Sequence, residues 1–265
     1  MGNIHYSSKS LVEFYKEHRF TWRDLYPSER WIFERVFSER EAQSGPKSVL
    51  DVGCACGGLY AALSERFSIT AYAGIDINQD VIEWAAERFQ GQPANFQVAD
   101  IAQAGESLGQ HDVVASLSCA DWNIETRAII ESCWKAVAPG GVFIVSLRLT
   151  DQQGVNDIES SYQIIEGLTR NLEDQEEDDT AEKANYVVLN WRESLKMLGA
   201  LKGAKRILKY GYWGKPSASA TTPFERLCFT VCAVYKDEGG ESEIASESDD
   251  PGVELYLPLD LLSGE

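Results

Sequence analysis

The sequence predicts an α/β fold with a doubly wound, mostly parallel sheet. The first observation is that short apolar runs alternate with amphipathic helices between residues 48 and 150. Runs that are apolar throughout are typical of parallel strands covered by helices on both faces. The second observation is a glycine-rich turn after the first run, at residues 53–58. Sheets of this kind bind ligands at the carboxyl ends of their strands, so we expect a binding site at that turn.

Five strands and three helices are expected in this region. The strands are residues 48–52, 71–76, 95–99, 112–117 and 142–147. The helices are residues 57–66, residues 80–89 and a third with the inner face Ile129, Ile130, Cys133, Trp134 and Val137. Apolar residues recur in these segments with the spacing of one helical face.

Residues 1–45 are expected to form an N-terminal helical cap. Its apolar residues recur at helical spacing in two groups, namely Leu11, Phe14 and Tyr15, and then Ile32, Phe33, Val36 and Phe37. Gly45 and Pro46 end the segment, because both residue types interrupt helices.

The main domain is expected to span residues 46–236, with an insertion at residues 151–204. A helix at residues 190–198 and strands at 206–212 and 227–235 follow the acidic part of the insertion. Residues 237–265 are rich in Gly, Ser, Glu and Asp, which predicts a disordered tail. The alternative is that the apolar end of that tail, residues 253–257, docks on a partner or on the protein itself.

The net charge is −18, with 24 basic against 42 acidic residues. A binder of nucleic acid needs a basic face, so the balance argues against nucleic acid as a partner. Most of the excess lies in two segments, because residues 151–183 carry −9 and residues 237–265 carry −10. The rest of the chain is close to neutral, and several basic residues lie between Lys202 and Lys215.

Composition also bears on location and metals. No apolar run reaches the roughly 18 residues of a membrane span, and the first residues lack an apolar signal core. Six cysteines without an export signal are expected to be reduced thiols in a cytoplasmic protein. Three histidines, none near a cysteine pair, give no basis for a metal site. The oligomeric state is left open.

The turn after the first strand reads Asp-Val-Gly-Cys-Ala-Cys-Gly-Gly, from Asp51 to Gly58. Small residues let the backbone approach a ligand, and the following helix start presents free N–H groups. A dinucleotide motif, G-x-G-x-x-G, would fall on Gly53, Ala55 and Gly58, with alanine where a pyrophosphate needs glycine. The pattern D-x-G-x-G-x-G would fall on Asp51, Gly53, Ala55 and Gly57.

The second pattern resembles motif I of the class I S-adenosylmethionine-dependent methyltransferases. Gly74-Ile75-Asp76-Ile77 resembles the acidic end of the family's second strand, where a carboxylate takes two ribose hydroxyls. Ala99-Asp100-Ile101 resembles the acid after the third strand, which accepts from the adenine amino group. Ala138-Pro139-Gly140-Gly141 is similar to the turn before the fifth strand. The resemblance covers residues 46–150.

The resemblance implies a seven-stranded Rossmann-like sheet, an antiparallel seventh strand and S-adenosylmethionine as the cofactor. Asp51 would hold the ammonium group of the cofactor, through water if needed. Asp76 would accept two charge-assisted hydrogen bonds from the ribose. The implied cofactor-binding residues are Asp51, Gly53, Cys54, Ala55, Gly57, Asp76, Ile77, Asp100, Ile101 and Ser118.

The acceptor is expected to bind after the fourth strand, at residues 118–123. Asp121 is the candidate catalytic residue, as a base or as a group that orients the acceptor. An N-cap of the next helix is an equally good interpretation of Asp121 or Asn123. The candidate substrate-binding residues are Trp122, Asn123, Arg148, Tyr212 and Lys215.

Two further segments have open interpretations. One interpretation is that the loop at residues 214–223 closes over the site, with the aromatic residues within 210–213 and Lys215 meeting the acceptor; the other is an ordinary strand with a solvated lysine. Aromatic residues of the N-terminal segment either cover the cofactor or pack in the core, and these are Tyr15, Phe20, Trp22 and Tyr26.

The sequence therefore predicts an enzyme that moves a methyl group from S-adenosylmethionine to an oxygen or nitrogen of a small molecule, with a sugar or glycan precursor among the candidates. Methyl transfer requires the protein mainly to position the acceptor. Two alternatives stay open. One is an NAD-dependent oxidoreductase, which Ala55 disfavours. The other is a catalytically silent methyltransferase-like binding or scaffold protein.

Overall fold

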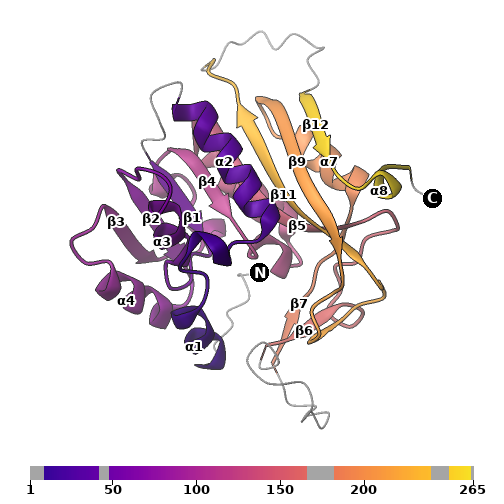
Figure 1. Cartoon of the computed structure of the whole chain (residues 1–265), viewed down its shortest axis with the longest axis horizontal. Helices are drawn as coiled ribbons and strands as arrows, with labels where there is room; N and C mark the ends of the chain where they lie inside the picture. Colours follow the sequence, from indigo (N-terminus) through magenta and orange to yellow (C-terminus); the bar gives the residue numbers. More distant parts are fainter. Residues whose placement is uncertain (1–8, 42–47, 166–181, 240–250, 264–265) are drawn as a thin grey trace.

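The computed structural model describes residues 9–41, 48–165, 182–239 and 251–263. Its centre is one large sheet with the strand order β12-β9-β11-β5-β4-β1-β2-β3, and β8 pairs with the carboxyl end of β5 (Figure 1). The strands are β1 (Val49–Val52), β2 (Tyr72–Asp76), β3 (Ala94–Val98), β4 (His111–Ser116), β5 (Val137–Thr150), β8 (Leu189–Asn190), β9 (Ala204–Gly214), β11 (Leu227–Lys236) and β12 (Gly252–Tyr256).

The sheet confirms the predicted doubly wound fold. Its neighbours pair in parallel except at β11, which runs antiparallel to both β5 and β9. The five expected strands of the first half are β1 to β5, and β9 and β11 complete the expected seven. Strands β8 and β12 extend the sheet beyond that expectation.

Helices cover both faces of the sheet, because successive strand residues face opposite sides. Val49 packs in one core cluster with α2, α3 and α4, whereas Leu50 packs in the other with α6, α7 and α8. The helices are α1 (Lys9–Glu17), α2 (Pro27–Glu41), α3 (Gly58–Ser64), α4 (Gln79–Arg88), α5 (Ile101–Ala104), α6 (Thr126–Lys135), α7 (Trp191–Gly199) and α8 (Leu259–Ser263). Short 3₁₀ turns lie at η1 (Trp22–Asp24), η2 (Gly105–Leu108) and η3 (Ala120–Trp122).

The N-terminal segment packs mainly through α2. Helix α2 crosses β11 and β9 (Figure 1), and its inner face is fully buried at Ile32, Phe33, Val36 and Phe37. Helix α1 lies apart from this contact, against α4. In the described residues, no helix is long and apolar enough to cross a membrane, and no cluster of three or more His, Cys, Asp or Glu side chains could hold a metal ion.

A second, smaller sheet follows the carboxyl end of β5. It has the order β10-β6-β7, from β10 (Ala220–Thr221), β6 (Tyr162–Ile164) and β7 (Lys183–Asn185). The loop at residues 214–223 belongs to this sheet, because Gln163 Nε2 donates to Ser217 Oγ at 2.9 Å and to Ser219 Oγ at 3.0 Å. These contacts hold the loop in the small sheet, while residues 210–213 lie in β9 and Lys215 is exposed, as the interpretation of an ordinary strand with a solvated lysine expects.

The prediction of a disordered tail is wrong for residues 251–263. Strand β12 pairs in parallel with β9, Glu254 Oε1 accepts from Arg206 Nε at 2.6 Å, and Tyr256 lies with its ring 4.9 Å from that of Trp31. Leu261 in α8 is fully buried. The apolar end of the tail thus docks on the protein itself, where alternating side chains fit the edge of the sheet. Residues 240–250 lie outside the described part of the chain.

Candidate functional site

A cavity opens at the carboxyl ends of β1, β2 and β4, where the sequence places the site. Its lining comes from the turn after β1, the end of β2, the segments after β3 and β4, and the N-terminal segment. The predicted site residues that line it are Asp51, Gly53, Cys54, Ala55, Asp76, Ile77, Ile101, Ser118, Trp122 and Asn123. Predicted residues that are not part of this lining are Gly57, Asp100, Asp121, Arg148, Tyr212 and Lys215.

The glycines of the turn are required by close contacts. Gly53 has φ +77°, and a Cβ there would lie 2.7 Å from Sγ of Cys119. Gly57 has φ +74° and precedes α3, and a Cβ there would lie 2.8 Å from the ring of Phe89. Because non-glycine residues avoid this left-handed region, both positions favour glycine on backbone grounds as well. Gly57 therefore shapes the turn from outside the cavity.

Ala55 adopts the same left-handed conformation, with φ +46°. This explains why the related motif has glycine here, since the conformation strains a residue with a Cβ. The backbone N–H of Ala55 donates to Asp76 Oδ2 at 3.0 Å. The strained turn thereby fixes the carboxylate at the end of β2.

Asp76 is held from both sides. Its Oδ1 accepts from the backbone N–H of Asn78 at 2.9 Å, and Oδ2 accepts from Ala55. Asn78 in turn caps α4 by accepting from the backbone N–H of Asp80. The carboxylate of Asp76 therefore lines the cavity in a fixed orientation.

Asp51 is the most buried acid of the lining, with 3% of its surface exposed. The hydroxyl of Tyr72 donates to its Oδ2. Burial raises the pKa of Asp51 to about 7, and the hydrogen bond from Tyr72 opposes that rise. The sequence indicated Asp51 but gave no sign of its partner Tyr72.

The segment after β3 contributes apolar surface. Ile101 lines the cavity, together with Ala99. Asp100 lies between them and caps α5, because its Oδ1 accepts from the backbone N–H of Ala102 at 2.9 Å and its Oδ2 accepts from Gln103 Nε2 at 3.0 Å. The structure therefore gives Asp100 a capping role beside the cavity.

The N-terminal segment closes the cavity with residues that include Val12, Tyr15, His18, Arg19 and Leu25. Only Tyr15 among them was a candidate from the sequence, and burial raises its pKa to about 12. Phe20 and Trp22 pack elsewhere, with Phe20 against Trp84 and Trp22 against Phe67. Tyr26 is 54% exposed, beneath the guanidinium of Arg19.

Arg19 is fixed at the edge of the cavity. Its Nη2 donates to both carboxylate oxygens of Glu29 at 2.7 Å, and Glu29 is only 1% exposed. Its backbone has φ +70°, and its carbonyl oxygen would lie 2.8 Å from a Cβ at Gly58. The sequence signal for this segment was its helical spacing and its aromatic residues, and these did not distinguish the cavity from the core.

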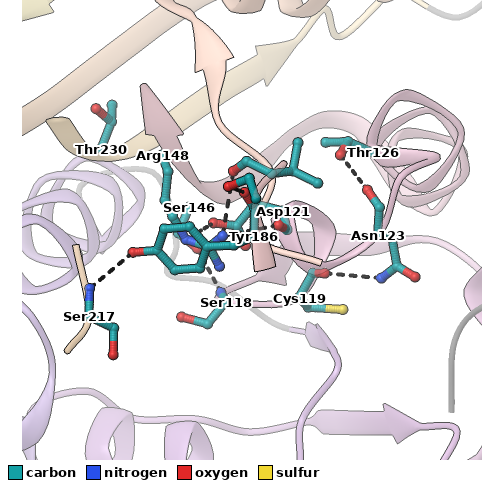
Figure 2. Close-up of polar contacts among 12 residues, drawn as sticks. Ser118, Cys119, Asp121, Asn123, Thr126, Ser146, Arg148, Tyr186, Ser217 and Thr230 are labelled. Carbon is teal, nitrogen blue, oxygen red and sulfur yellow. Dashed lines mark hydrogen bonds and ion pairs between the residues drawn. The ribbon is translucent and has the colours of Figure 1, made fainter. Parts of the chain in front are cut away.

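Asp121 lies behind the cavity in a buried ion pair with Arg148 (Figure 2). Asp121 Oδ2 is 3.2 Å from Arg148 Nε, and the two residues are 3% and 6% exposed. Arg148 Nη1 also donates to the carbonyl oxygens of Asp121 and Val187, at 3.3 Å and 3.4 Å. The guanidinium lies 3.8 Å from the ring centre of Tyr186. Burial raises the pKa of Asp121, and Arg148 opposes that rise.

The segment that follows β4 is held in place by local hydrogen bonds. Ser118 has φ +48°, and its backbone N–H donates to Ser146 Oγ at 2.6 Å. Asn123 Nδ2 donates to the carbonyl oxygen of Cys119 at 3.2 Å, and the carbonyl oxygen of Asn123 accepts from Thr126 Oγ1 at 2.7 Å (Figure 2). Trp122 and Asn123 line the cavity from this segment.

The two candidates on β9 and its loop lie apart from this cavity. Tyr212 packs near Phe229 at a ring distance of 6.3 Å, and Lys215 is exposed. The structure thus brings together candidates at the carboxyl ends of β1, β2 and β4, but not Tyr212 on β9 or Lys215 after it.

Comparison with known proteins agrees with this geometry. Residues 49–141 match a family model described as a methyltransferase domain. A ubiquinone biosynthesis O-methyltransferase of Psychrobacter cryohalolentis is 30% identical over 132 residues, which are 44% of this chain and 50% of that protein. An uncharacterised methyltransferase of Mycobacterium bovis is 34% identical over 106 residues, which are 40% of this chain and 53% of that protein. The chain thus spans about half the length of these curated relatives.

A solved structure shows the same fold over most of the chain. The S-adenosylmethionine-dependent methyltransferase from Clostridium acetobutylicum has a TM-score of 0.51 at 15% identity, covering 86% of this chain and 98% of that one. The predicted resemblance is confirmed: residues 49–141 form a methyltransferase domain of the class I S-adenosylmethionine-dependent family, whose cofactor is S-adenosylmethionine.

Proposed function

We propose that the chain transfers a methyl group from S-adenosylmethionine to an oxygen or nitrogen atom of a small-molecule acceptor. The main observation behind the proposal is that Asp51, Asp76 and the strained turn at Ala55 all line one cavity. The Psychrobacter relative is an O-methyltransferase, which supports oxygen as the acceptor atom.

The lining fits the chemistry of that cofactor. Its sulfonium and ammonium groups carry positive charge, which Asp51 and Asp76 would offset. Asp76 would also accept from ribose hydroxyls, and Arg19 would meet the carboxylate of the methionine part. Apolar residues of the lining, among them Val81 and Ile101, would flank the adenine ring. When bound, the cofactor supplies a methyl group that the acceptor takes by in-line displacement.

On the acceptor side, Trp122 offers a flat apolar face and Asn123 an amide. An aromatic face beside a hydrogen-bonding amide suits a ring that carries hydroxyl groups, so a sugar or glycan precursor is the acceptor class that we put forward. Asp121 would orient this segment through its ion pair with Arg148, from behind the cavity.

His18 is the residue that we propose takes a proton from the acceptor. It lines the cavity, and its Nδ1 lies 2.8 Å from the carbonyl oxygen of Phe14. Because a carbonyl oxygen only accepts, Nδ1 is the donor in this contact, which leaves Nε2 as the ring nitrogen that would take the proton. A hydroxyl acceptor needs such a base during transfer.

Calorimetry with S-adenosylmethionine and, separately, with NAD(H) tests the assignment. Binding of S-adenosylmethionine alone is expected. Binding of NAD(H) alone would identify an oxidoreductase, and binding of neither would favour a scaffold protein. A screen of sugars, hydroxyacids, phenols and amines, read as release of S-adenosylhomocysteine, then tests the acceptor class.

A further inference from the structure

Tyr72 is placed to control the charge of Asp51. It begins β2, next to β1, and its hydroxyl donates to Asp51 Oδ2. The ring of Tyr72 packs 5.0 Å from that of Tyr60 and 5.9 Å from that of Phe96. Tyr72 and Asp51 are 4% and 3% exposed, so the hydrogen bond is shielded from water and fixed in direction.

This hydrogen bond uses only one oxygen of the carboxylate. Asp51 also lines the cavity, so its carboxylate lies where a bound ligand would meet it. A neutral carboxylic acid would carry a proton and would attract an ammonium group weakly. The state of Asp51 therefore decides whether the cavity holds a cationic group at this point.

The surroundings of Asp51 work mostly against ionisation. Burial has the largest effect and raises the pKa of Asp51 to about 7, the nearby acids raise it further, and Tyr72 and Arg19 lower it. The titratable groups that face Asp51 come from β2, the N-terminal segment, α2 and the segments after β1 and β4, and they are Tyr72, Asp76, Arg19, Glu29, Cys54 and Cys119.

We propose that Tyr72 is a positioning residue that keeps Asp51 ionised and aimed at the cavity, and so lets the site select ligands with an ammonium group. The proposal rests on the proposed use of S-adenosylmethionine. The proposal assigns the selection of ammonium ligands to the side chains of Tyr72 and Asp51. Of these two residues, only Asp51 belongs to the glycine-rich motif at the end of β1.

The expected consequence is a pH-dependent affinity for S-adenosylmethionine. Asp51 has a raised pKa, so affinity should rise with pH and level off near pH 7. In Tyr72→Phe the ring packing stays but the donor is lost. A hydrogen bond to a charged group is strong enough that its loss should raise the pH at which the affinity levels off by about one to two units. At pH 7.5 the affinity should then be roughly tenfold lower than in the wild type.

The experiment compares two ligands in the full chain. Calorimetric titrations with S-adenosylmethionine are made between about pH 5.5 and 7.5, which lies below the ordinary pKa of about 8 for an α-amino group, so that most of the ligand carries a protonated ammonium group. Identical titrations with 5′-methylthioadenosine, which has the nucleoside but no amino acid, provide the control. Tyr72→Phe should weaken only S-adenosylmethionine. Asp51→Asn should remove the pH dependence, and adding Tyr72→Phe to it should have no further effect.

The outcomes separate the two ideas. If the wild type does not bind S-adenosylmethionine, the proposed function falls and this inference falls with it. If it binds both ligands, but Tyr72→Phe leaves S-adenosylmethionine unchanged or weakens both ligands equally, Tyr72 has no positioning role. A wild-type ratio of the two affinities that does not change with pH would overturn the inference even if Tyr72→Phe fails to fold.

Discussion

Removing Arg148 should destabilise the fold strongly, because it would leave the Asp121 carboxylate buried without its cation. The side chains are 7% and 5% exposed, and the ion pair measures 3.2 Å. Breaking such a pair by removing one partner costs about 3–5 kcal/mol. Arg148→Met keeps much of the apolar volume but loses the charge, the two carbonyl contacts and the stacking on Tyr186. We therefore expect a loss of about 3–5 kcal/mol in the free energy of unfolding at neutral pH.

The loss should depend on pH in a defined direction. Burial raises the pKa of Asp121, and without Arg148 nothing in the pair opposes that rise. An acid with a raised pKa is most stable protonated, so stability is present at low pH and is lost as pH rises through the folded-state pKa. Arg148→Met should accordingly lose less stability at pH 5 than at pH 8.

Urea unfolding followed by tryptophan fluorescence measures both effects. Arg66→Met is the matched control, because the Arg66–Glu34 pair has a similar distance of 3.0 Å but side chains that are 52% and 50% exposed. That change should cost less than about 1 kcal/mol. Combining Asp121→Asn with Arg148→Met should remove the pH dependence. A loss below about 1 kcal/mol for Arg148→Met, or a loss equal at both pH values, would refute the reasoning.

Asp76→Ala should weaken S-adenosylmethionine binding by about 1.5–3 kcal/mol in calorimetry if Asp76 accepts from the ribose, and an unchanged affinity would contradict that role. His18→Gln should lower kcat about 10²–10⁴-fold while leaving cofactor affinity intact, provided that His18 is the base; equal kcat values would exclude it. Ala55→Gly should raise the free energy of unfolding by up to about 1 kcal/mol, because relief of left-handed strain exceeds the added chain entropy. Leu261→Ala should cost about 2–5 kcal/mol, and a neutral result in urea unfolding would show that α8 is not docked in solution.

Local patterns were sufficient to predict the first half of the sheet. Strands such as β1 and β4 send apolar residues into both core clusters because helices cover both faces of the sheet, and this leaves a clear signal. Asp51 lies near the carboxyl end of β1 and Asp76 ends β2, so their meeting at one edge of the sheet followed from the topology. The sequence also marked Ala55 as a departure from glycine, whereas its left-handed backbone is seen only in the structure.

Contacts between distant segments were not predictable in the same way. The position of Asp121 depends on Arg148, 27 residues later, and on Val187 in the insertion. Likewise, nothing near Asp51 in the sequence indicated that the Tyr72 hydroxyl would donate a hydrogen bond to its carboxylate. The tail was misjudged because its acidic composition outweighed the short alternation of Val253, Glu254 and Leu255, which fits an edge strand.

The docking of β12 and α8 also bears on aggregation. Strand β9 is eleven residues long and carries aromatic side chains, and as an open edge it would expose a row of N–H and C=O groups to other chains. Strand β12 covers Arg206 to Tyr210, and beyond it Asp260 accepts from Trp213 Nε1 at 2.8 Å. The new edge is only five residues long and includes a glutamate. Strand β12 thereby replaces a long edge strand that could pair with other chains by a short edge strand that carries a charge. Proteolysis within the tail should therefore promote intermolecular strand pairing and loss of solubility.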